Sequence, residues 1–172
     1  MAENYRLATL NDAENLLQLT LRAYEPIREL DLKFPAATAN IDLVQQNIDK
    51  NACYLLEVDG ELVATITIQF PWGDNSVKLD IPYIWWFAVD PGWGKQGFGS
   101  KLLAWTELYI RDNLKAPAVS LATSDRHPWL VAMYERKGYE RAFEKDFGKD
   151  GKVVYLKKVL RPKAIQQQLI KE

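Results

Sequence analysis

The feature that most constrains the fold is an apolar run that passes almost directly into a glycine-rich segment. Residues Tyr83–Val89 read YIWWFAV, and GWGKQGFGSKLL (92–103) follows after two residues. A run without alternation predicts a strand covered on both faces, at the centre of a sheet. Gly92, Gly94 and Gly97 then have the spacing G-x-G-x-x-G before a helix, where backbone N–H groups converge on an anion. We therefore expect a central strand, an anion-binding turn and a helix in succession.

Hydrophobic periodicity and turn residues predict the other elements. A helix capped by Asn11 or Asp12 should bury Leu16, Leu17, Thr20, Leu21 and Tyr24, and the helix of 98–113 should bury Phe98, Leu102, Leu103, Thr106 and Ile110. Further helices are expected at Ile41–Ile48, between Pro128 and Gly138, and for a turn or two in 161–172. The expected strands are Tyr5–Ala8, Cys53–Val58, Leu62–Phe70, Val77–Val89, Ala118–Thr123, Tyr139–Phe147 and Val153–Leu160.

These elements predict an α/β fold of the α+β, three-layer kind. Asp59-Gly60 marks a hairpin turn, and Pro82 predicts a bulge or a break in pairing because proline cannot donate to the ladder. The sheet should be mixed and mostly antiparallel, with about six to seven strands flanked by about four helices and one parallel crossover after the glycine loop.

Composition limits the classes of protein that the chain can belong to. It has 172 residues and a net charge of −1, so we expect one domain over residues 1–172 and no nucleic-acid partner. No apolar run is long enough to span a bilayer and no signal peptide is present, which predicts a cytoplasmic protein without a membrane partner. The single cysteine, Cys53, excludes an internal disulfide and a thiolate zinc cluster, and we expect it to be a buried spectator. No metal site is expected.

The glycine loop by itself leaves more than one interpretation. A Walker loop requires lysine after its last glycine, where this chain has Phe98. A dinucleotide-binding fold requires repeated βαβ units, whereas here the loop follows meandering strands. A plain glycine-rich turn and an anion site at a helix N-terminus both remain open.

Two further motifs lead to a resemblance. Val89–Gly99 is similar to V-x-P-x-x-[RQ]-x-x-G-x-[GA], His127–Tyr139 is similar to N-x-x-A-x-x-x-Y-x-x-x-G-[FY], and Arg6–Ala13 reads R-x-A-x-x-x-D-A. The chain thus resembles the GNAT superfamily of N-acetyltransferases, which bind acetyl-CoA. It departs from the patterns at Gly94, where arginine or glutamine is usual, and at His127 and Leu130, which replace asparagine and alanine. Lys95 or Gln96 is a candidate to supply the lost polar contact.

The resemblance implies a site and a mechanism. Backbone N–H groups of Phe87–Val89 would face the thioester carbonyl, and Tyr134 would share or donate a proton as the thiolate leaves. His127 would lie on the cofactor side and serve as a helix-start residue. The implied cofactor site comprises Phe87, Ala88, Val89, Gly94, Lys95, Gln96, Gly97, Phe98, Gly99, Ser100 and His127.

The base and the acceptor are less defined. Asp80, Tyr83, Asp125 and His127 are the candidates for a base, and a chain of water molecules without a single base is the preferred interpretation. The acceptor site should be walled by about Tyr24–Ile48 and Phe70–Ser76. Trp72, Trp85, Trp86 and Tyr83 are candidates for an aromatic pocket, with core packing as the alternative for Trp85 and Trp86.

We therefore expect an acyltransferase that moves an acetyl group from acetyl-CoA to a primary amine, most readily of a small molecule. Attack would be direct, in a ternary complex, without an acetyl-enzyme on Cys53. The alternatives are acetylation of a protein or peptide N-terminus or lysine, and a non-catalytic acyl-CoA sensor or binding module. A homodimer is an additional possibility, because dimers are common in such folds.

Overall fold

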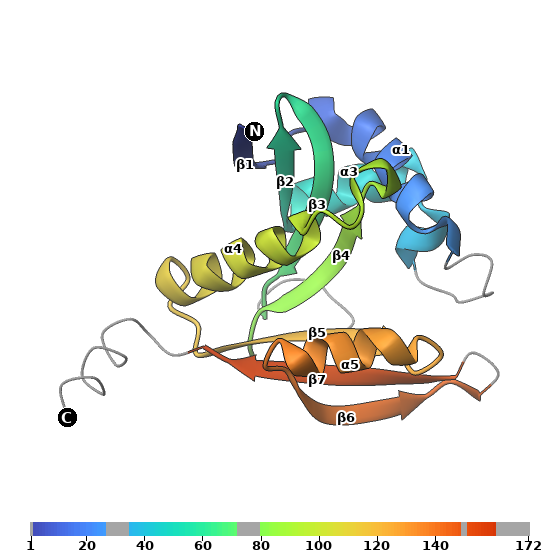
Figure 1. The fold of residues 1–172 in the computed structure, drawn as a ribbon, viewed down its shortest axis with the longest axis vertical. Coiled ribbons are helices and arrows are strands. Elements are labelled where there is room, and N and C mark those ends of the chain that lie inside the picture. The colour runs from blue at the N-terminus through green and yellow to red at the C-terminus, as the bar shows by residue number, and fades with distance from the viewer. Residues whose placement is uncertain (1, 27–34, 72–79, 149–150, 161–172) are drawn as a thin grey trace.

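The computed structural model describes residues 2–26, 35–71, 80–148 and 151–160. These residues form a seven-stranded sheet in the order β1-β2-β3-β4-β5-β7-β6 (Figure 1). The strands are β1 Glu3–Leu7, β2 Ala52–Val58, β3 Glu61–Gln69, β4 Tyr83–Val89, β5 Ala118–Ser124, β6 Glu140–Asp146 and β7 Lys152–Val159. The helices are α1 Ala13–Ala23, α3 Ile41–Lys50, α4 Phe98–Asp112 and α5 Pro128–Arg136.

Neighbouring strands are antiparallel except β4 and β5, which are parallel. This confirms the predicted fold class, the single parallel crossover and the order of the elements. The β2–β3 turn also forms as predicted, since Asp59 (φ 51°) and Gly60 (φ 82°) both adopt the left-handed conformation that a two-residue hairpin turn requires. The predicted helical turns in 161–172 lie outside the described residues. A single domain over 1–172 stays a prediction.

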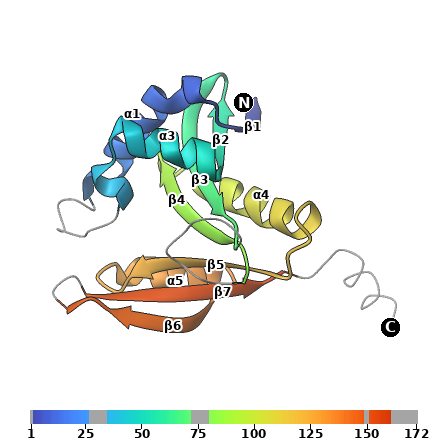
Figure 2. The same ribbon diagram turned by 180° about the vertical axis from the view of Figure 1, so that it is seen from behind.

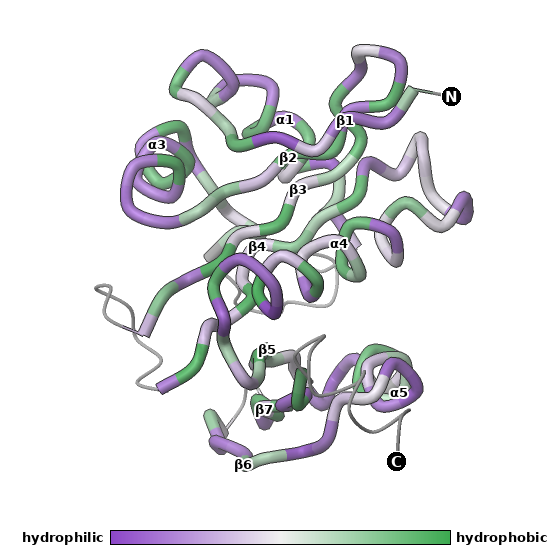
Figure 3. Tube along the Cα trace, turned by 90° about the vertical axis from the view of Figure 1, so that its left-hand side faces the viewer, coloured by the Kyte–Doolittle hydropathy of each residue, from purple (hydrophilic) through white to green (hydrophobic). Residues whose placement is uncertain are grey.

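The helices cover the sheet from both sides (Figures 2 and 3). On one side, α1 and α3 pack over β2–β4 and bury residues that include Leu16, Val44 and Trp86. On the other side, α4 and α5 enclose the larger part of the core with β2, β3, β4, β5 and β7. All five residues predicted to face inward from α4 are buried. On α1, Leu16 and Thr20 are buried as predicted, whereas the predicted Leu17, Leu21 and Tyr24 are half-buried and Leu19 is buried instead, on the same face of the helix as Leu16 and Thr20.

Strand β4 differs from its prediction in three respects. It begins at Tyr83, so residues 80–82 of the expected strand are outside it and 77–79 lie outside the described residues. Burial alternates along it rather than being continuous, since Ile84, Trp86 and Ala88 are buried and the residues between them are half-buried. The irregularity expected at Pro82 lies at Trp86, which has φ 51° where the register with β3 shifts between Thr65 and Thr67.

The sheet opens between β4 and β5. These parallel strands pair at Tyr83 and Ser120, where the Ser120 N–H donates to the Pro82 carbonyl at 3.0 Å. Beyond this point the arm formed by β5, β7, β6 and α5 diverges from β4 (Figure 1). The apolar character of β4 is thereby explained, because Ile84 packs in the core on the α4 side, Trp86 packs in the core on the α1 side, and the whole strand lines the opening. No helix among the described residues combines the length and apolar character needed to traverse a bilayer.

Candidate active site

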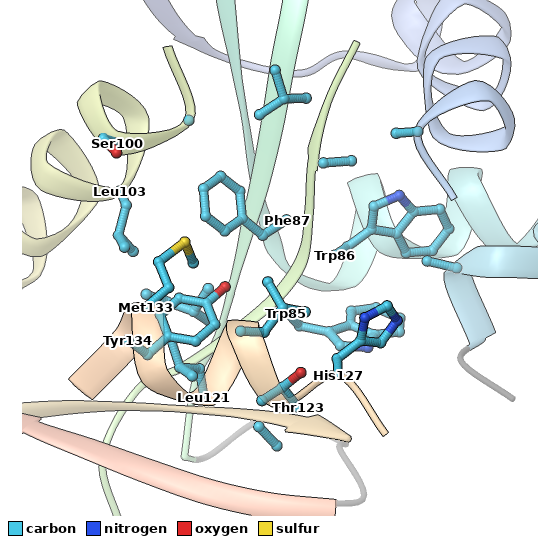
Figure 4. A pocket seen from close by; sticks show the side chains of 18 of the residues that line it. Trp85, Trp86, Phe87, Ser100, Leu103, Leu121, Thr123, His127, Met133 and Tyr134 are labelled. Atoms are coloured by element: carbon cyan, nitrogen blue, oxygen red, sulfur yellow. The ribbon is translucent and has the colours of Figure 1, made fainter. Parts of the chain in front are cut away.

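A cavity of about 790 Å³ lies where β4 and β5 diverge, bounded by the start of α4 and one side of α5 (Figure 4). Tyr134 and ten of the eleven residues that the sequence assigned to the cofactor line this one cavity. The exception is Gln96, which is exposed and lies outside the lining. The tertiary structure therefore brings the glycine-loop motif and the motif that contains Tyr134 to one cavity, although the two motifs are far apart in the sequence.

The start of α4 presents backbone donors to the cavity. The first hydrogen bond into this helix runs from the Lys101 N–H to the Gly97 carbonyl at 3.0 Å, so the N–H groups of Phe98, Gly99 and Ser100 precede it. Gly97 at the N-cap has φ 81°, a conformation that glycine adopts without strain. The Gly94 N–H, in contrast, donates to the Pro91 carbonyl at 3.2 Å and is already committed to its own turn. The candidate donors for an anion are thus the backbone amides of residues 98–100.

A cation that the sequence analysis missed reaches the same place. Lys137, the C-cap residue of α5, donates from Nζ to the Ser100 Oγ at 2.9 Å. Its ammonium group lies beside the positive end of the α4 dipole, which favours a bound anion further. It is a candidate to offset the missing arginine or glutamine at Gly94. The sequence placed Lys137 directly before Gly138, at the end of the α5 motif, but nothing in the sequence showed that its side chain would reach α4.

Strand β4 is held from the opposite side by α1. The Trp86 indole N–H donates to the Thr20 Oγ1 at 2.8 Å, and both residues are buried. The Tyr24 hydroxyl donates to the Phe87 carbonyl at 3.2 Å. These bonds fix the irregular segment of β4 whose backbone borders the cavity. Tyr24 also lines the cavity. The sequence had indicated it only as one end of the expected acceptor-site wall, Tyr24–Ile48.

Tyr134 projects from α5 with its hydroxyl directed into the cavity (Figure 4). It is buried, and its ring contacts that of Tyr139 edge to face at 5.7 Å. Burial raises the pKa of Tyr134 to about 12. The hydroxyl therefore keeps its proton at neutral pH and is a hydrogen-bond donor to any group that develops negative charge beside it.

His127 occupies the N-cap of α5, the helix start predicted for it, although its side chain makes no capping hydrogen bond. The residue is 2% exposed and lines the cavity. Neither Nδ1 nor Nε2 has a hydrogen-bond partner within the described part of the chain. Burial, and secondarily the charge of Arg126, lower the pKa of the imidazole below its usual 6.5. The imidazole is therefore neutral at pH 7.

The other candidate residues divide between the cavity and the surface. Tyr83 and Trp85 line the cavity, whereas Trp86 is shared between the cavity wall and the core. Asp80 and Asp125 are exposed and outside the lining, and the Asp125 carboxylate accepts from the Lys152 N–H at 2.9 Å. Trp72 lies outside the described residues.

Cys53 is buried, as predicted, and does not line the cavity. Its Sγ lies 3.6 Å from the Thr65 Oγ1, and burial raises the pKa of the thiol. The described residues hold no group of His, Cys, Asp and Glu side chains suited to bind a metal ion.

Comparison with known proteins places this geometry in a family. Residues 13–139 match the acetyltransferase (GNAT) family. The chain is 58% identical to an S-(2-succino)cysteine N-acetyltransferase of Bacillus subtilis, with 94% of this chain and 98% of that protein covered. It is 47% identical to an S-alkylcysteine N-acetyltransferase of the same organism, with 96% and 94% covered.

A solved structure shows the same fold. The PaiA N-acetyltransferase of Thermoplasma acidophilum in complex with coenzyme A superposes with a TM-score of 0.68 at 12% identity, covering 92% of this chain and 99% of that one. The donors of 98–100, Lys137 and the adjoining cavity suit a molecule with a diphosphate and a long arm. The chain is therefore an acyltransferase that uses acetyl-CoA, and it belongs to the acetyltransferase (GNAT) family.

Proposed function

We propose that this protein transfers the acetyl group of acetyl-CoA to the α-amine of an S-substituted cysteine. The observation that carries this proposal is the identity of 58% and 47%, over nearly the whole chain, to two enzymes named for such substrates. Both names share a cysteine amine and a thioether and differ in the group on sulfur. The shared part of the substrate is what we assign to this chain.

The donor half of the site would be formed by backbone and the side chain of Lys137. The N–H groups of Phe98, Gly99 and Ser100, with the Lys137 ammonium, would hold the diphosphate of acetyl-CoA. Backbone N–H of the segment Phe87–Val89 would face the thioester carbonyl, where negative charge develops during attack. The bonds from Trp86 to Thr20 and from Tyr24 to Phe87 support this segment, so its donors are held in position before the reaction.

Tyr134 would stabilise the leaving sulfur. A thiol has an ordinary pKa of about 8.5, well below that of about 12 for the buried phenol. Complete transfer of the phenolic proton to a free thiolate is therefore unfavourable. This pKa difference instead supports a hydrogen bond from the Tyr134 hydroxyl to the departing sulfur. The phenolic proton would pass to the sulfur only as a proton from the amine replaces it.

The acceptor half is aromatic. Tyr24, Tyr83, Trp85 and Trp86 line it, and such rings make favourable contacts with thioether sulfur and carbon. Among the described lining residues the cations are Lys95 and Lys137, both toward α4. S-(2-succino)cysteine is the first candidate substrate because of the higher identity. S-alkylcysteine is the second, because the uncharged aromatic lining favours an apolar substituent.

Direct attack in a ternary complex is the proposed kinetic course. Cys53 is buried outside the cavity, so we expect no acetyl group on it after incubation with acetyl-CoA alone. Intact-protein and peptide mass spectrometry would detect such an adduct, and an acetylated Cys53 that is chased onto amine would contradict the proposal.

The experiment that tests the substrate class is a thiol-release assay with acetyl-CoA and a panel of amines. The panel contains S-(2-succino)cysteine, S-methylcysteine, S-benzylcysteine, free lysine and a peptide with a free N-terminus. We expect kcat/KM for at least one S-substituted cysteine to exceed that for lysine and peptide by about 10²-fold or more, as a site built to pair with a substrate's polar groups discriminates strongly. Preference for lysine or peptide would overturn the proposal.

A further inference from the structure

We propose that the imidazole of His127 is the base that takes a proton from the acceptor amine. Neither the family pattern, which has asparagine at this position, nor the names of the relatives assign such a role. The inference rests on the proposed function only in the identity of the amine. It applies to whichever primary amine the enzyme acetylates.

The first observation is an unsatisfied side chain. Buried polar groups are hydrogen-bonded in the great majority of cases, yet both ring nitrogens of His127 lack a partner in the described part of the chain. The ring is held by contact instead, edge to face with Trp129 at 4.5 Å. A neutral imidazole carries one donor and one acceptor nitrogen, and a bound amine provides the matching N–H. The missing partner is thus expected to arrive with the substrate.

The second observation is the placement of His127 relative to Tyr134. The two residues are seven positions apart at the two ends of α5, so about two helical turns, or roughly 10 Å along the axis, separate them on the same side of the helix. Both line the cavity (Figure 4). The β4 backbone at Phe87 borders this same cavity. One helix therefore offers a phenol for the leaving sulfur and an imidazole for the incoming nitrogen.

The third observation is the electrostatic environment of the ring. Burial and Arg126 keep the imidazole neutral at pH 7, which is the form that accepts a proton. An α-amine has a pKa of about 7.7–8.0, so most of it is protonated at pH 7 and must lose a proton before attack. The phenols that line the cavity have raised pKa values and stay neutral, and the nearest carboxylate along the chain, Asp125, is bonded to the Lys152 N–H. The phenols are those of Tyr24, Tyr83, Tyr134 and Tyr155, and the charged residues that line the cavity are Lys95 and Lys137.

Two protons leave the nitrogen during the transfer. The ammonium group gives one proton to His127, and the freed lone pair forms the new C–N bond while the C–S bond breaks. A second proton leaves the nitrogen as sulfur gains one, with the Tyr134 hydroxyl as the group beside the sulfur. The imidazolium then returns its proton to solvent through the cavity. The products are the amide, the coenzyme A thiol and one released proton.

The test compares three variants of the full chain. His127→Asn introduces the family's residue, His127→Gln provides a second amide of greater reach, and Asp125→Asn is the matched control at an exposed residue that retains an oxygen to accept from Lys152. Circular dichroism and thermal unfolding check that each variant folds. Kinetics are measured with the best amine of the panel from about pH 6 to pH 9, a range that brackets the amine pKa.

We expect both His127 variants to lose about 10²- to 10⁴-fold in kcat/KM for the amine at pH 7, the usual contribution of a positioned base. Their activity should rise up to tenfold per pH unit below the amine pKa of about 7.7–8.0 and level off above it, whereas the wild-type rate should depend less on pH over the same range. KM for acetyl-CoA and the kinetics of Asp125→Asn should stay unchanged. A raised KM for acetyl-CoA with an unaltered pH profile would show instead that His127 contacts the cofactor, and would overturn the inference.

The two proposals fail separately. If the wild-type enzyme acetylates an amine other than an S-substituted cysteine, the proposed function fails and the His127 variants are measured on that amine. If the wild type prefers S-substituted cysteines and the His127 variants keep wild-type activity and pH dependence, only the present inference fails.

Discussion

The bond between Trp86 and Thr20 yields a prediction whose size follows from the structure. Trp86 has φ 51°, a conformation that is rare for bulky residues and persists only where the surroundings enforce it. Its indole N–H donates to the Thr20 Oγ1 at 2.8 Å, and Thr20 in turn donates to the Leu16 carbonyl at 2.8 Å. Thr20→Val keeps the shape of the side chain but leaves a buried indole N–H without an acceptor.

Thr106 provides a matched control. Like Thr20 it is 0% exposed on a helix, and its hydroxyl donates to the carbonyl four residues earlier, that of Leu102, at 2.8 Å. Thr106→Val therefore loses the same helical bond without leaving an indole unpaired. The difference between the variants isolates the buried N–H, whose loss of a partner costs about 1–3 kcal/mol in the free energy of unfolding. For a chain of this size each kcal/mol shifts Tm by about 2–4 °C, which gives about 2–12 °C.

Urea unfolding followed by circular dichroism measures this difference, and kcat measures its effect on β4. We expect Thr20→Val to be less stable than Thr106→Val by the stated amount and to have the lower kcat, since the backbone at Phe87 depends on the same irregular segment. Equal stability of the two variants would show that the indole bond does not hold β4, and would refute the reasoning.

Three further predictions concern single charges and hydroxyls. Tyr134→Phe should lower kcat by about 10- to 150-fold, the worth of one hydrogen bond to a charged group, while the Kd of coenzyme A measured by calorimetry stays the same; a loss beyond about 10⁴-fold would mean complete proton transfer. Lys137→Met should raise KM for acetyl-CoA about tenfold and weaken its dependence on salt, because the ammonium beside Ser100 is lost; an unchanged KM in steady-state assays would exclude the contact. The Arg6 guanidinium lowers the pKa of Asp12 from 3.8 to about 2, so stability from this pair is present above 3.8 and is lost as pH falls through about 2. Asp12→Asn should cost about 2 kcal/mol at pH 7 and little at pH 2 in urea titrations, and a pH-independent cost would contradict the assignment.

The sequence by itself determined the local structure of this protein. The inward face of α4, the hairpin at Asp59-Gly60 and the extent of α5 all form as predicted. Each depends on periodicity, caps and turn residues within one short segment, and such signals can be read without knowing the partners. The glycine loop and the motif ending in Tyr139 likewise indicated which segments would meet at the cavity.

The tertiary structure alone decided how the site is assembled. Trp86 meets an acceptor 66 residues away in the chain, and Lys137 meets Ser100 across 37 residues, so neither contact has a local signal. The apolar run of β4 predicted cover on both faces, and its residues do pack on both sides of the sheet, but nothing in the run indicated that they would also line a cavity. His127 matched a motif position, but only its burial without a partner distinguishes it from a capping residue. These contacts and the burial of His127 depend on which surfaces of the chain come together on folding. The packing of β4, β5 and α5 as a whole determines those surfaces.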